Sequence, residues 1–314
     1  MSDHCDGWEF FNPRGHVNRT WIEVLKWRLT SRAKPWPLTV ALPRQPRPKP
    51  SAEGEVVATW INHATFLLQT SAGNVLTDPI YGARASPFAW AGPRRAHLPG
   101  LPFEQLPHID VILLSHDHYD HCHLSTLRRL AQAFQPVVIT PLGNGPLIAR
   151  AGLQRIIELD WWQHHAINPD FQVTLTPARH WSNRLSGARN GRLWGGFYLH
   201  SAKHRIYFSG DTGYDSEFFK AIGRNLGPPD LAMIPIGAYE PRWFMAAQHC
   251  NPVEAVQIHR DVGARQSLGM HWGTFQLTDE AREDPVQALS AACKAANLTK
   301  EEFRALLPGE SVRV

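Results

Sequence analysis

The chain has 314 residues, of which 43% are hydrophobic and 19% charged, so it has enough apolar side chains for a buried core and too little charge for disorder. No apolar run approaches the roughly 20 residues of a membrane-spanning helix, which excludes an integral membrane protein. The four cysteines show no close pairing, and the N-terminus lacks the apolar core of a signal peptide. We therefore expect a reducing, cytoplasmic location, with peripheral attachment to a membrane as an option.

The positive charge is concentrated at the N-terminus. Residues 1–50 carry nine lysines and arginines against four acidic residues, whereas the formal net charge of the whole chain is only +4. Nucleic acid, an anionic membrane surface or solubility alone would each account for this basic segment.

Residues 1–50 are expected to form a basic, proline-rich N-terminal extension. Trp21, Val24, Leu25 and Arg28 recur at helical spacing and predict a short helix with a basic side. Six prolines in residues 32–50 fix φ and remove amide donors, so this stretch is predicted to be an extended arm. The helix could lie on a membrane, or it could cover the folded body or a partner subunit.

Residues 51–314 are expected to form one α/β hydrolase domain, because short apolar runs alternate with segments of helical period. Strands are predicted over residues 56–60, 66–69, 75–76, 111–114, 137–140, 173–176, 205–208, 231–234 and 267–270. Helices are predicted over residues 124–134, 216–222, 252–262 and 285–296.

The most informative segment is residues 115–121, Ser-His-Asp-His-Tyr-Asp-His, directly after the buried strand 111–114. Three imidazoles and two carboxylates so close together are costly to bury without a cation. His116 and His118 are alternate residues that an extended backbone sends to one side, whereas Asp120 and His121 follow a turn and can face a second ion. Imidazole and carboxylate are the ligands of zinc and similar divalent ions. A solvated histidine-rich loop is the alternative.

Two metal shells need further ligands, and three candidates occur in matching contexts. His180, Asp211 and His271 each lie just beyond the C-terminal end of a predicted strand. Taken singly, each histidine could be a structural residue. Their shared position predicts that they gather along one edge of a sheet, where ligands meet in α/β folds.

This pattern resembles the metallo-β-lactamase superfamily, whose signature is His-x-His-x-Asp-His followed by a His, an Asp or Cys, and a His. The resemblance implies an αββα sandwich with two divalent ions, zinc being the expected metal. Its ligand sets would be His116, His118 and His180 for one ion and Asp120, His121 and His271 for the other, bridged by Asp211. An aspartate at the bridging place is similar to phosphodiesterase-like members and disfavours a β-lactamase, because β-lactamases with two zincs carry cysteine there.

The likeness extends to a narrower family, the N-acyl-phosphatidylethanolamine-hydrolysing phospholipases D. The similar segments are WINHAT (60–65), LTDPI (76–80), ELDWW (158–162), GDTGY (210–214), IPIGAYEPRWFM (234–245) and HWGTF (271–275). The match covers roughly residues 55–310 in order, whereas residues 1–50 match weakly. Two positions depart from the family pattern: Asn62, where glycine is usual, and Asp117, where asparagine is usual.

The resemblance implies a zinc-dependent phosphodiesterase of phospholipase D type, which would release N-acylethanolamine and phosphatidic acid. Two ions can share a water, lower its pKa to give a metal-bridged hydroxide, and clamp the phosphodiester oxygens. Asp120 could orient the proton of the water. His249 lies just before a predicted helix, in a place suited to anions, and could donate to a phosphate oxygen or protonate the leaving alkoxide. A capping role is the alternative for His249.

Four more residues are placed near the site. Tyr119 and Gln248 are candidates for substrate contact, and Asp78 and His63 are candidates for orienting the ligand histidines from behind. A buried polar residue without such a role is the alternative for Asp78 and His63. The aromatic pairs at 161–162 and 243–244 are expected in the core, and the histidines at 164–165 in an exposed loop.

Three functions follow from these observations. The first is hydrolysis of an N-acylated phospholipid at a membrane surface, with no nucleic-acid partner expected and a homodimer left open. The second keeps the metals but changes the substrate to a cyclic nucleotide, another phosphodiester or a lactone, since fold and metals cannot separate these. The third is a metal-independent scaffold or nucleic-acid binder using the basic extension, against which the complete ligand set argues.

Overall fold

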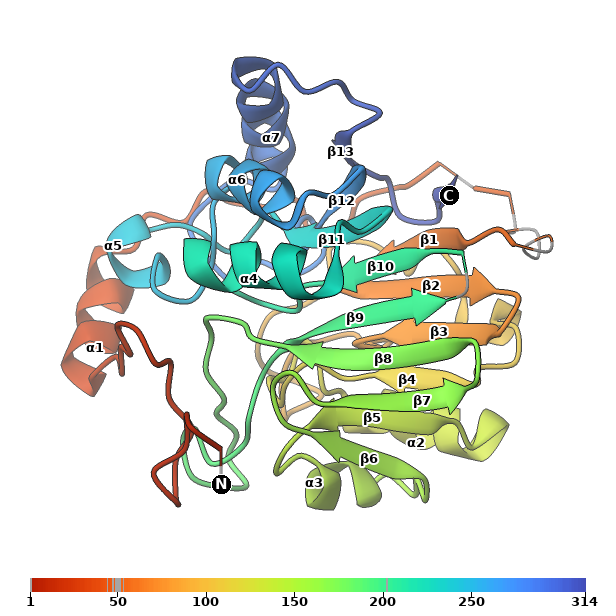
Figure 1. Ribbon diagram of the computed structural model, residues 1–314. Coiled ribbons are helices and arrows are strands. Elements are labelled where there is room, and N and C mark those ends of the chain that lie inside the picture. Colours follow the sequence, from red (N-terminus) through yellow and green to blue (C-terminus); the bar gives the residue numbers. More distant parts are fainter. Residues whose placement is uncertain (1, 44, 47, 49–51, 53, 202) are drawn as a thin grey trace.

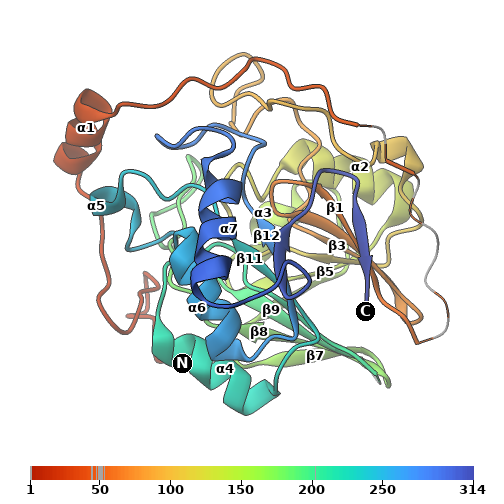
Figure 2. The same cartoon turned by 90° about the horizontal axis from the view of Figure 1, so that it is seen from above.

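The computed structural model describes residues 2–43, 45, 46, 48, 52, 54–201 and 203–314. Two seven-stranded sheets pack face to face, and helices cover their outer faces, which gives the layers α, β, β, α (Figures 1 and 2). The predicted αββα sandwich is confirmed.

The first sheet has the strand order β14-β1-β2-β3-β4-β5-β6. Its strands are β1 (Val57–Asn62), β2 (Thr65–Thr70), β3 (Gly73–Thr77), β4 (Val111–Leu113), β5 (Val137–Pro141), β6 (Ile156–Leu159) and β14 (Ser311–Arg313). Strands β3 to β6 are parallel. The intervening helices are η1 (Phe103–Gln105), α2 (Leu124–Phe134) and α3 (Gly145–Ala149).

The second sheet has the strand order β13-β12-β11-β10-β9-β8-β7. Its strands are β7 (His164–Asn168), β8 (Phe171–Thr176), β9 (Gly196–Ser201), β10 (Arg205–Phe208), β11 (Leu231–Pro235), β12 (Gln266–Met270) and β13 (Phe303–Ala305). The helices that follow β10 are α4 (Ser216–Leu226), α5 (Arg242–Met245), α6 (Pro252–Val262) and α7 (Asp284–Ala295). Helices α4, α6 and α7 cover the outer face of this sheet (Figure 1).

Strand β4 shows why the middle of the sandwich is stable. Val111 and Leu113 belong to the cluster between the sheets, whereas Ile112 packs with Leu127 and Leu130 of α2 on the opposite face. Both faces of a parallel strand are covered in such a sandwich, which explains a continuous apolar run without alternation. Each leucine buried in this way contributes about 1.5–3 kcal/mol.

The topology brings the ends of distant strands to one edge. Strands β3 and β4 are parallel, as are β10, β11 and β12. Strand β8 runs antiparallel to β9, which runs antiparallel to β10, so β8 points the same way as β10. The segments that follow β3, β4, β8, β10 and β12 carry all seven predicted metal ligands and Asp78, and they therefore meet.

Several elements differ from the predictions. His164 and His165 were expected in a loop but lie in β7, at the edge of the second sheet. This polar edge strand lacks the apolar alternation that marks a half-buried strand. Trp162 and Trp243 are 38% and 43% exposed, so the prediction of a core position is wrong for them, although it is confirmed for their neighbours Trp161 and Phe244.

The predicted N-terminal helix is α1 (Trp21–Thr30), which begins with a capping box between Thr20 and Glu23. It lies beside α5 at the margin of the molecule (Figures 1 and 2). Arg19 fixes its start, because the Arg19 guanidinium donates to the carbonyl oxygens of Trp243 and Phe244. None of the described helices is long and apolar enough to cross a bilayer.

Candidate metal centre

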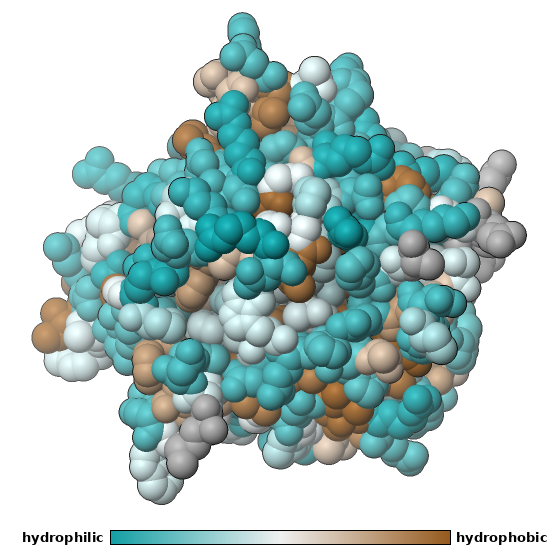
Figure 3. Space-filling view, viewed as in Figure 1, coloured by the Kyte–Doolittle hydropathy of each residue, from teal (hydrophilic) through white to brown (hydrophobic). Residues whose placement is uncertain are grey.

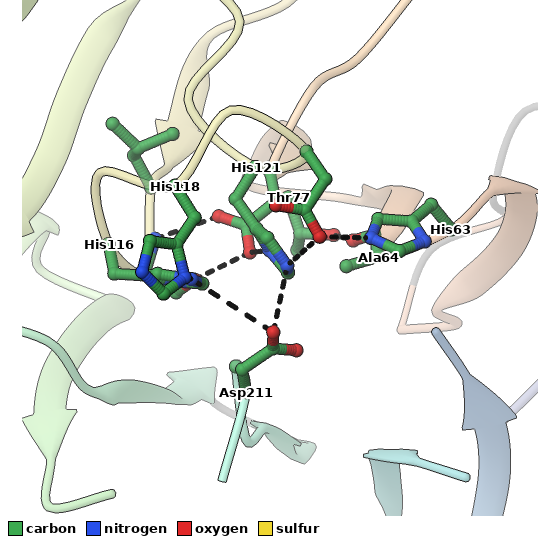
Figure 4. Close-up of polar contacts among 12 residues, drawn as sticks. His63, Ala64, Thr77, His116, His118, His121 and Asp211 are labelled. Carbon is green, nitrogen blue, oxygen red and sulfur yellow. Dashed lines mark hydrogen bonds and ion pairs between the residues drawn. The ribbon is translucent and has the colours of Figure 1, made fainter. Parts of the chain in front are cut away.

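The carboxylate of Asp211 lies at the middle of the predicted ligands. Its Oδ2 is 3.1 Å from Nε2 of both His121 and His271, 3.8 Å from Nε2 of His180 and 4.0 Å from Nε2 of His116. Figure 4 shows Asp211 pointing from the second sheet towards His116 and His121, which come from the first sheet. The structure therefore brings the bridging candidate between the two predicted ligand sets.

The first ligand set is compact. Nδ1 of His118 lies 2.9 Å from Nε2 of His116 and 3.2 Å from Nε2 of His180. Two nitrogen ligands of one tetrahedral zinc ion would lie about 3.3 Å apart, given bonds of about 2.0–2.1 Å. These three nitrogen atoms could therefore hold one cation with little movement.

The second ligand set gathers around Asp120. Its Oδ2 lies 3.3 Å from Nε2 of His121 and 3.3 Å from Nε2 of His271. Nε2 of His63 is 2.9 Å from the same oxygen and is placed to donate a hydrogen bond to it. His63 thus lies beside the second set, as expected, and can orient Asp120.

Three donor atoms of the second set and of the bridging Asp211 fit a divalent cation. Nε2 of His121, Nε2 of His271 and Oδ1 of Asp211 are buried and have no hydrogen-bond partner among the described residues. Leaving such atoms unpaired is costly, and a cation would satisfy all three.

The charge balance of the centre also suits a cation. Burial lowers the pKa of His118 to about 4 and that of His180 to about 3, so both are neutral at pH 7 with a free lone pair. Although burial opposes it, the neighbouring His121 and His271 hold the pKa of the Asp211 carboxyl well below its usual range. The pKa of the Asp120 carboxyl is lowered in the same way by His121, and the two carboxylates in turn raise the pKa of His121 and His271. A bound cation would take the place of the protons that these two imidazoles carry without it.

Asp78 lies behind two of the histidines, in the place where the sequence analysis expects a residue that orients them. Its Oδ2 accepts from the hydroxyl of Ser115 at 2.6 Å and lies 2.7 Å from Nδ1 of His121. The Ser115 hydroxyl in turn lies 2.9 Å from Nδ1 of His116. Such contacts fix which ring nitrogen faces the metal. Ser115 has no part in the sequence predictions, although its place before the motif could have indicated one.

Three residues at the same place have a strained backbone. His63, Asp78 and His271 have φ values of 45°, 32° and 61°, in the left-handed region that residues with a side chain seldom adopt. All three lie just after a strand end and turn a side chain towards the centre. Strain of this kind persists where surrounding contacts enforce it, which is typical of functional sites.

The structure explains why an aspartate stands at position 117, where the family pattern has asparagine. Its buried carboxylate accepts from Nη1 of Arg192 at 2.9 Å and from the backbone amide of Asn183 at 3.0 Å. Arg184 donates to the carbonyl oxygens of Asp117 and Cys122, at 2.6 and 2.9 Å. Residues 183–192, hereafter the clamp loop, therefore hold the ligand segment in place. Sequence reasoning missed this loop, because its partners are far away along the chain.

A cavity of about 490 Å³ opens above the centre. Its floor includes His118, Asp120 and Asp211, and its wall includes the predicted substrate contacts Tyr119, Gln248 and His249. The opposite wall was not predicted and combines cations with apolar side chains: Arg19, Val24, Trp27, Trp181, Arg189, Phe244, Met245 and Leu277. The N-terminal extension is therefore part of the cavity.

Two of the predicted contact residues have defined surroundings. The Tyr119 hydroxyl accepts from the backbone amide of Leu185 at 3.2 Å, which fixes the ring at the mouth of the site. Nδ1 of His249 is buried, has no hydrogen-bond partner in the described part of the chain and lies 4.0 Å from Oδ2 of Asp211. His249 is therefore free to bond to a bound molecule.

Comparisons with known proteins agree with this geometry. A family model described as the beta-lactamase superfamily domain matches residues 73–272. The chain is 39% identical over 235 residues to "N-acyl-phosphatidylethanolamine-hydrolyzing phospholipase D 1" of Caenorhabditis elegans, covering 72% of this chain and 66% of that protein. It is 33% identical over 242 residues to the mitochondrial protein of that activity in Saccharomyces cerevisiae, covering 74% of this chain and 51% of that protein.

A solved structure shows the same fold. Igni18, described as a metallo hydrolase from the archaeon Ignicoccus hospitalis, superposes with a TM-score of 0.62 at 18% sequence identity. The superposition covers 83% of this chain and 98% of that one.

Proposed function

Since the chain belongs to the beta-lactamase superfamily and is a metal-dependent hydrolase of that group, we propose that it is a zinc-dependent phosphodiesterase of phospholipase D type. Its substrates would be N-acyl-phosphatidylethanolamine-like lipids, and its products N-acylethanolamine and phosphatidic acid. The observation that carries the proposal is the Asp211 carboxylate, 3.1 Å from a histidine of each sheet and beneath a cavity with an apolar wall.

Two divalent cations, held by the two ligand sets and Asp211, would lower the pKa of a water and neutralise the non-bridging oxygens of a phosphodiester. Side chains of the protein accept and donate the protons of the reaction. Oδ2 of Asp120 is held by Nε2 of His63, and Asp120 lines the cavity, so its Oδ1 can accept a proton from the attacking water. His249 can donate to a phosphate oxygen or to the departing alkoxide.

The outer wall of the cavity supports a lipid substrate. Trp27 of α1 stacks on Phe244 of α5 with ring centres 5.0 Å apart, and Val24, Met245 and Leu277 extend this apolar surface. An acyl chain placed here would leave the phosphodiester over the ligand sets.

The outward face of α1 supports action at a membrane surface. Trp21, Ile22, Leu25 and Leu29 are 75%, 59%, 47% and 77% exposed, and the helix buries none of its residues. Figure 3 shows hydrophobic atoms at the margin where Figure 1 draws α1. Exposed apolar groups beside basic residues are typical of interfacial helices, so peripheral attachment follows as part of the proposal.

The proposal is tested by assaying four substrates side by side: N-acyl-phosphatidylethanolamine, bis(p-nitrophenyl) phosphate, cyclic AMP and a lactone. We expect zinc-loaded protein to hydrolyse the lipid most efficiently and Asp211→Asn to lose both lipid and diester hydrolysis. Hydrolysis of the small diester without hydrolysis of the lipid would remove the lipid assignment and keep the metal chemistry. Preference for the lactone or cyclic AMP would favour the second function considered above.

A further inference from the structure

One arginine of the cavity wall forms no ion pair with an acidic side chain of the described residues. Arg189 lies in the clamp loop, with its guanidinium carbon 4.7 Å from the centre of the Trp181 ring. The Trp181 ring packs edge-on against His118 of the first ligand set, with ring centres 4.7 Å apart. Arg189 and His118 both line the cavity above the metal ligands.

The hydrogen bonding of Arg189 is incomplete. Its Nη1 donates to the carbonyl oxygen of Arg19 at 2.7 Å, whereas its buried Nε has no partner among the described residues. Glu9 and Glu23 raise its pKa through their charges, but neither forms an ion pair with it in the described structure. Burial lowers the pKa of this guanidinium, so the cation is partly desolvated, and no acidic side chain in the described part of the chain lies within ion-pair distance of it.

The neighbouring arginines already have ion-pair or hydrogen-bond partners. Arg192 pairs with Asp117, Arg184 donates to two backbone carbonyls, and Arg19 pairs with Glu23. A partly buried cation costs free energy unless an anion or an acceptor compensates it. At the rim of a cavity, a bound anion can be this compensating group, since no acidic side chain that the structure describes pairs with Arg189.

We propose that Arg189 is a binding residue for the phosphoryl group of the substrate and product, which it contacts from the cavity wall while the metal ligands lie at the floor. This inference rests on the proposed function. The planar guanidinium offers parallel donors that match phosphate oxygens, and Trp181 keeps its plane in place. The competing explanation is that Arg189 only fastens the N-terminal extension through the Arg19 carbonyl.

The experiment measures binding to full-length, zinc-loaded protein by calorimetry, with inorganic phosphate and dihexanoyl phosphatidic acid as probes. We expect Arg189→Gln to weaken both by about tenfold or more, the effect of losing a hydrogen bond to a charged group, and Arg189→Lys to give intermediate values. Arg129→Gln is the matched control, because Arg129 also stacks on an aromatic ring, 3.9 Å from the centre of Phe103, and pairs with exposed Glu104 away from the cavity. It should bind both probes like the parent protein.

Unchanged binding of phosphatidic acid by Arg189→Gln would overturn the inference, whether or not inorganic phosphate is affected. Unchanged binding together with a lower melting temperature would assign Arg189 to fastening the extension. Neither measurement requires turnover, so the inference and the proposed function fail separately. If the parent protein does not hydrolyse the lipid but Arg189→Gln still weakens phosphate binding, the anion site stands and the phospholipase assignment falls.

Discussion

Each of three ligand histidines uses one ring nitrogen to contact the protein and turns the other inward. Nδ1 of His121 contacts Asp78, Nδ1 of His116 contacts Ser115, and Nδ1 of His180 lies 2.9 Å from the carbonyl oxygen of Gln248. These contacts set the tautomer of each histidine before a metal binds, which lowers the free-energy cost of forming the metal site.

Replacing Asp78 tests this orientation. Asp78→Asn keeps the size but presents an NH₂ donor or a weaker acceptor to His121, so we expect zinc affinity to fall about 10- to 100-fold, as for other residues that contact metal ligands. The measurement is zinc competition with a chromogenic chelator. Asp110→Asn is the control, because the Asp110 carboxylate accepts a hydrogen bond from the backbone amide of Asn74 in the first sheet. Equal zinc affinity in both variants would show that Asp78 does not orient the ligands.

The ion pair between Asp117 and Arg192 gives a second prediction for single residues. The Asp117 carboxylate is 1% exposed, so Arg192→Met leaves a buried charge without its partner and should lower the free energy of unfolding by about 3–5 kcal/mol. Adding Asp117→Asn removes the unpaired charge and should recover part of that loss. Urea unfolding of the two single variants and the double variant measures this coupling. Additive losses would contradict an ion pair that holds the ligand segment.

At the scale of elements, α1 has two faces with different roles. Val24 and Trp27 line the cavity, whereas Trp21, Leu25 and Leu29 point outward. This division follows from the helical period, which places residues three or four apart on one side. The inner face therefore belongs to the site, and deletion of residues 1–50 would damage the cavity as well as any membrane contact.

Substitutions on the outer face separate these roles. The triple change Trp21→Ser, Leu25→Ser and Leu29→Ser removes apolar area that would enter a bilayer, so binding to anionic vesicles should weaken more than tenfold, since each buried side chain contributes about 1.5–3 kcal/mol. Flotation with vesicles measures binding, and hydrolysis of bis(p-nitrophenyl) phosphate should stay unchanged. Leu98→Ser is the control, because Leu98 is 78% exposed, like Leu29 at 77%. Unaltered flotation of the triple variant would refute the membrane role of α1.

At the scale of the whole molecule, acid should destabilise the fold through buried histidines outside the metal centre. Burial lowers the pKa of His97 to about 4, and its Nε2 lies 3.0 Å from the Thr274 hydroxyl. The unfolded chain binds a proton near pH 6.5, so the stability contributed by His97 is present above pH 6.5 and is lost as the pH falls towards 4.

The expected loss from His97 is about 2 kcal/mol between pH 7 and pH 5. Urea unfolding at both pH values should show a smaller decrease for His97→Gln than for the parent protein, because glutamine does not titrate. Decreases of equal size in the two proteins would contradict the neutral state of buried His97.

The sandwich and the candidate ligand positions could be predicted because their signals are local, whereas the division of the ligands into two sets rests on the family resemblance. Strand β4 is a continuous apolar run, and the ligands follow directly after it or after similar strands. Strand β7 could not be predicted, since a polar edge strand has no apolar alternation. The expectations of no nucleic-acid partner and of an optional homodimer stay predictions.

The cavity wall could not be predicted, because it depends on contacts between distant segments. Arg189 donates to the carbonyl of Arg19, 170 positions earlier, and Arg192 pairs with Asp117 across 75 positions. No periodic pattern or local motif links such residues. The acidic Asp117 within a histidine motif is the one signal that could have indicated a cationic partner such as Arg192.

Under the proposed function, two cations at this centre drive hydrolysis of a lipid phosphodiester. The most direct measurement is zinc titration of metal-stripped protein in ¹⁸O-labelled water, with N-acyl-phosphatidylethanolamine as substrate and mass spectrometry of both products. We predict no hydrolysis by stripped protein, activity that saturates at two equivalents of zinc, and the ¹⁸O label in phosphatidic acid, as attack at phosphorus requires. Lipid hydrolysis that is independent of zinc, or absent at every zinc concentration, would contradict the account.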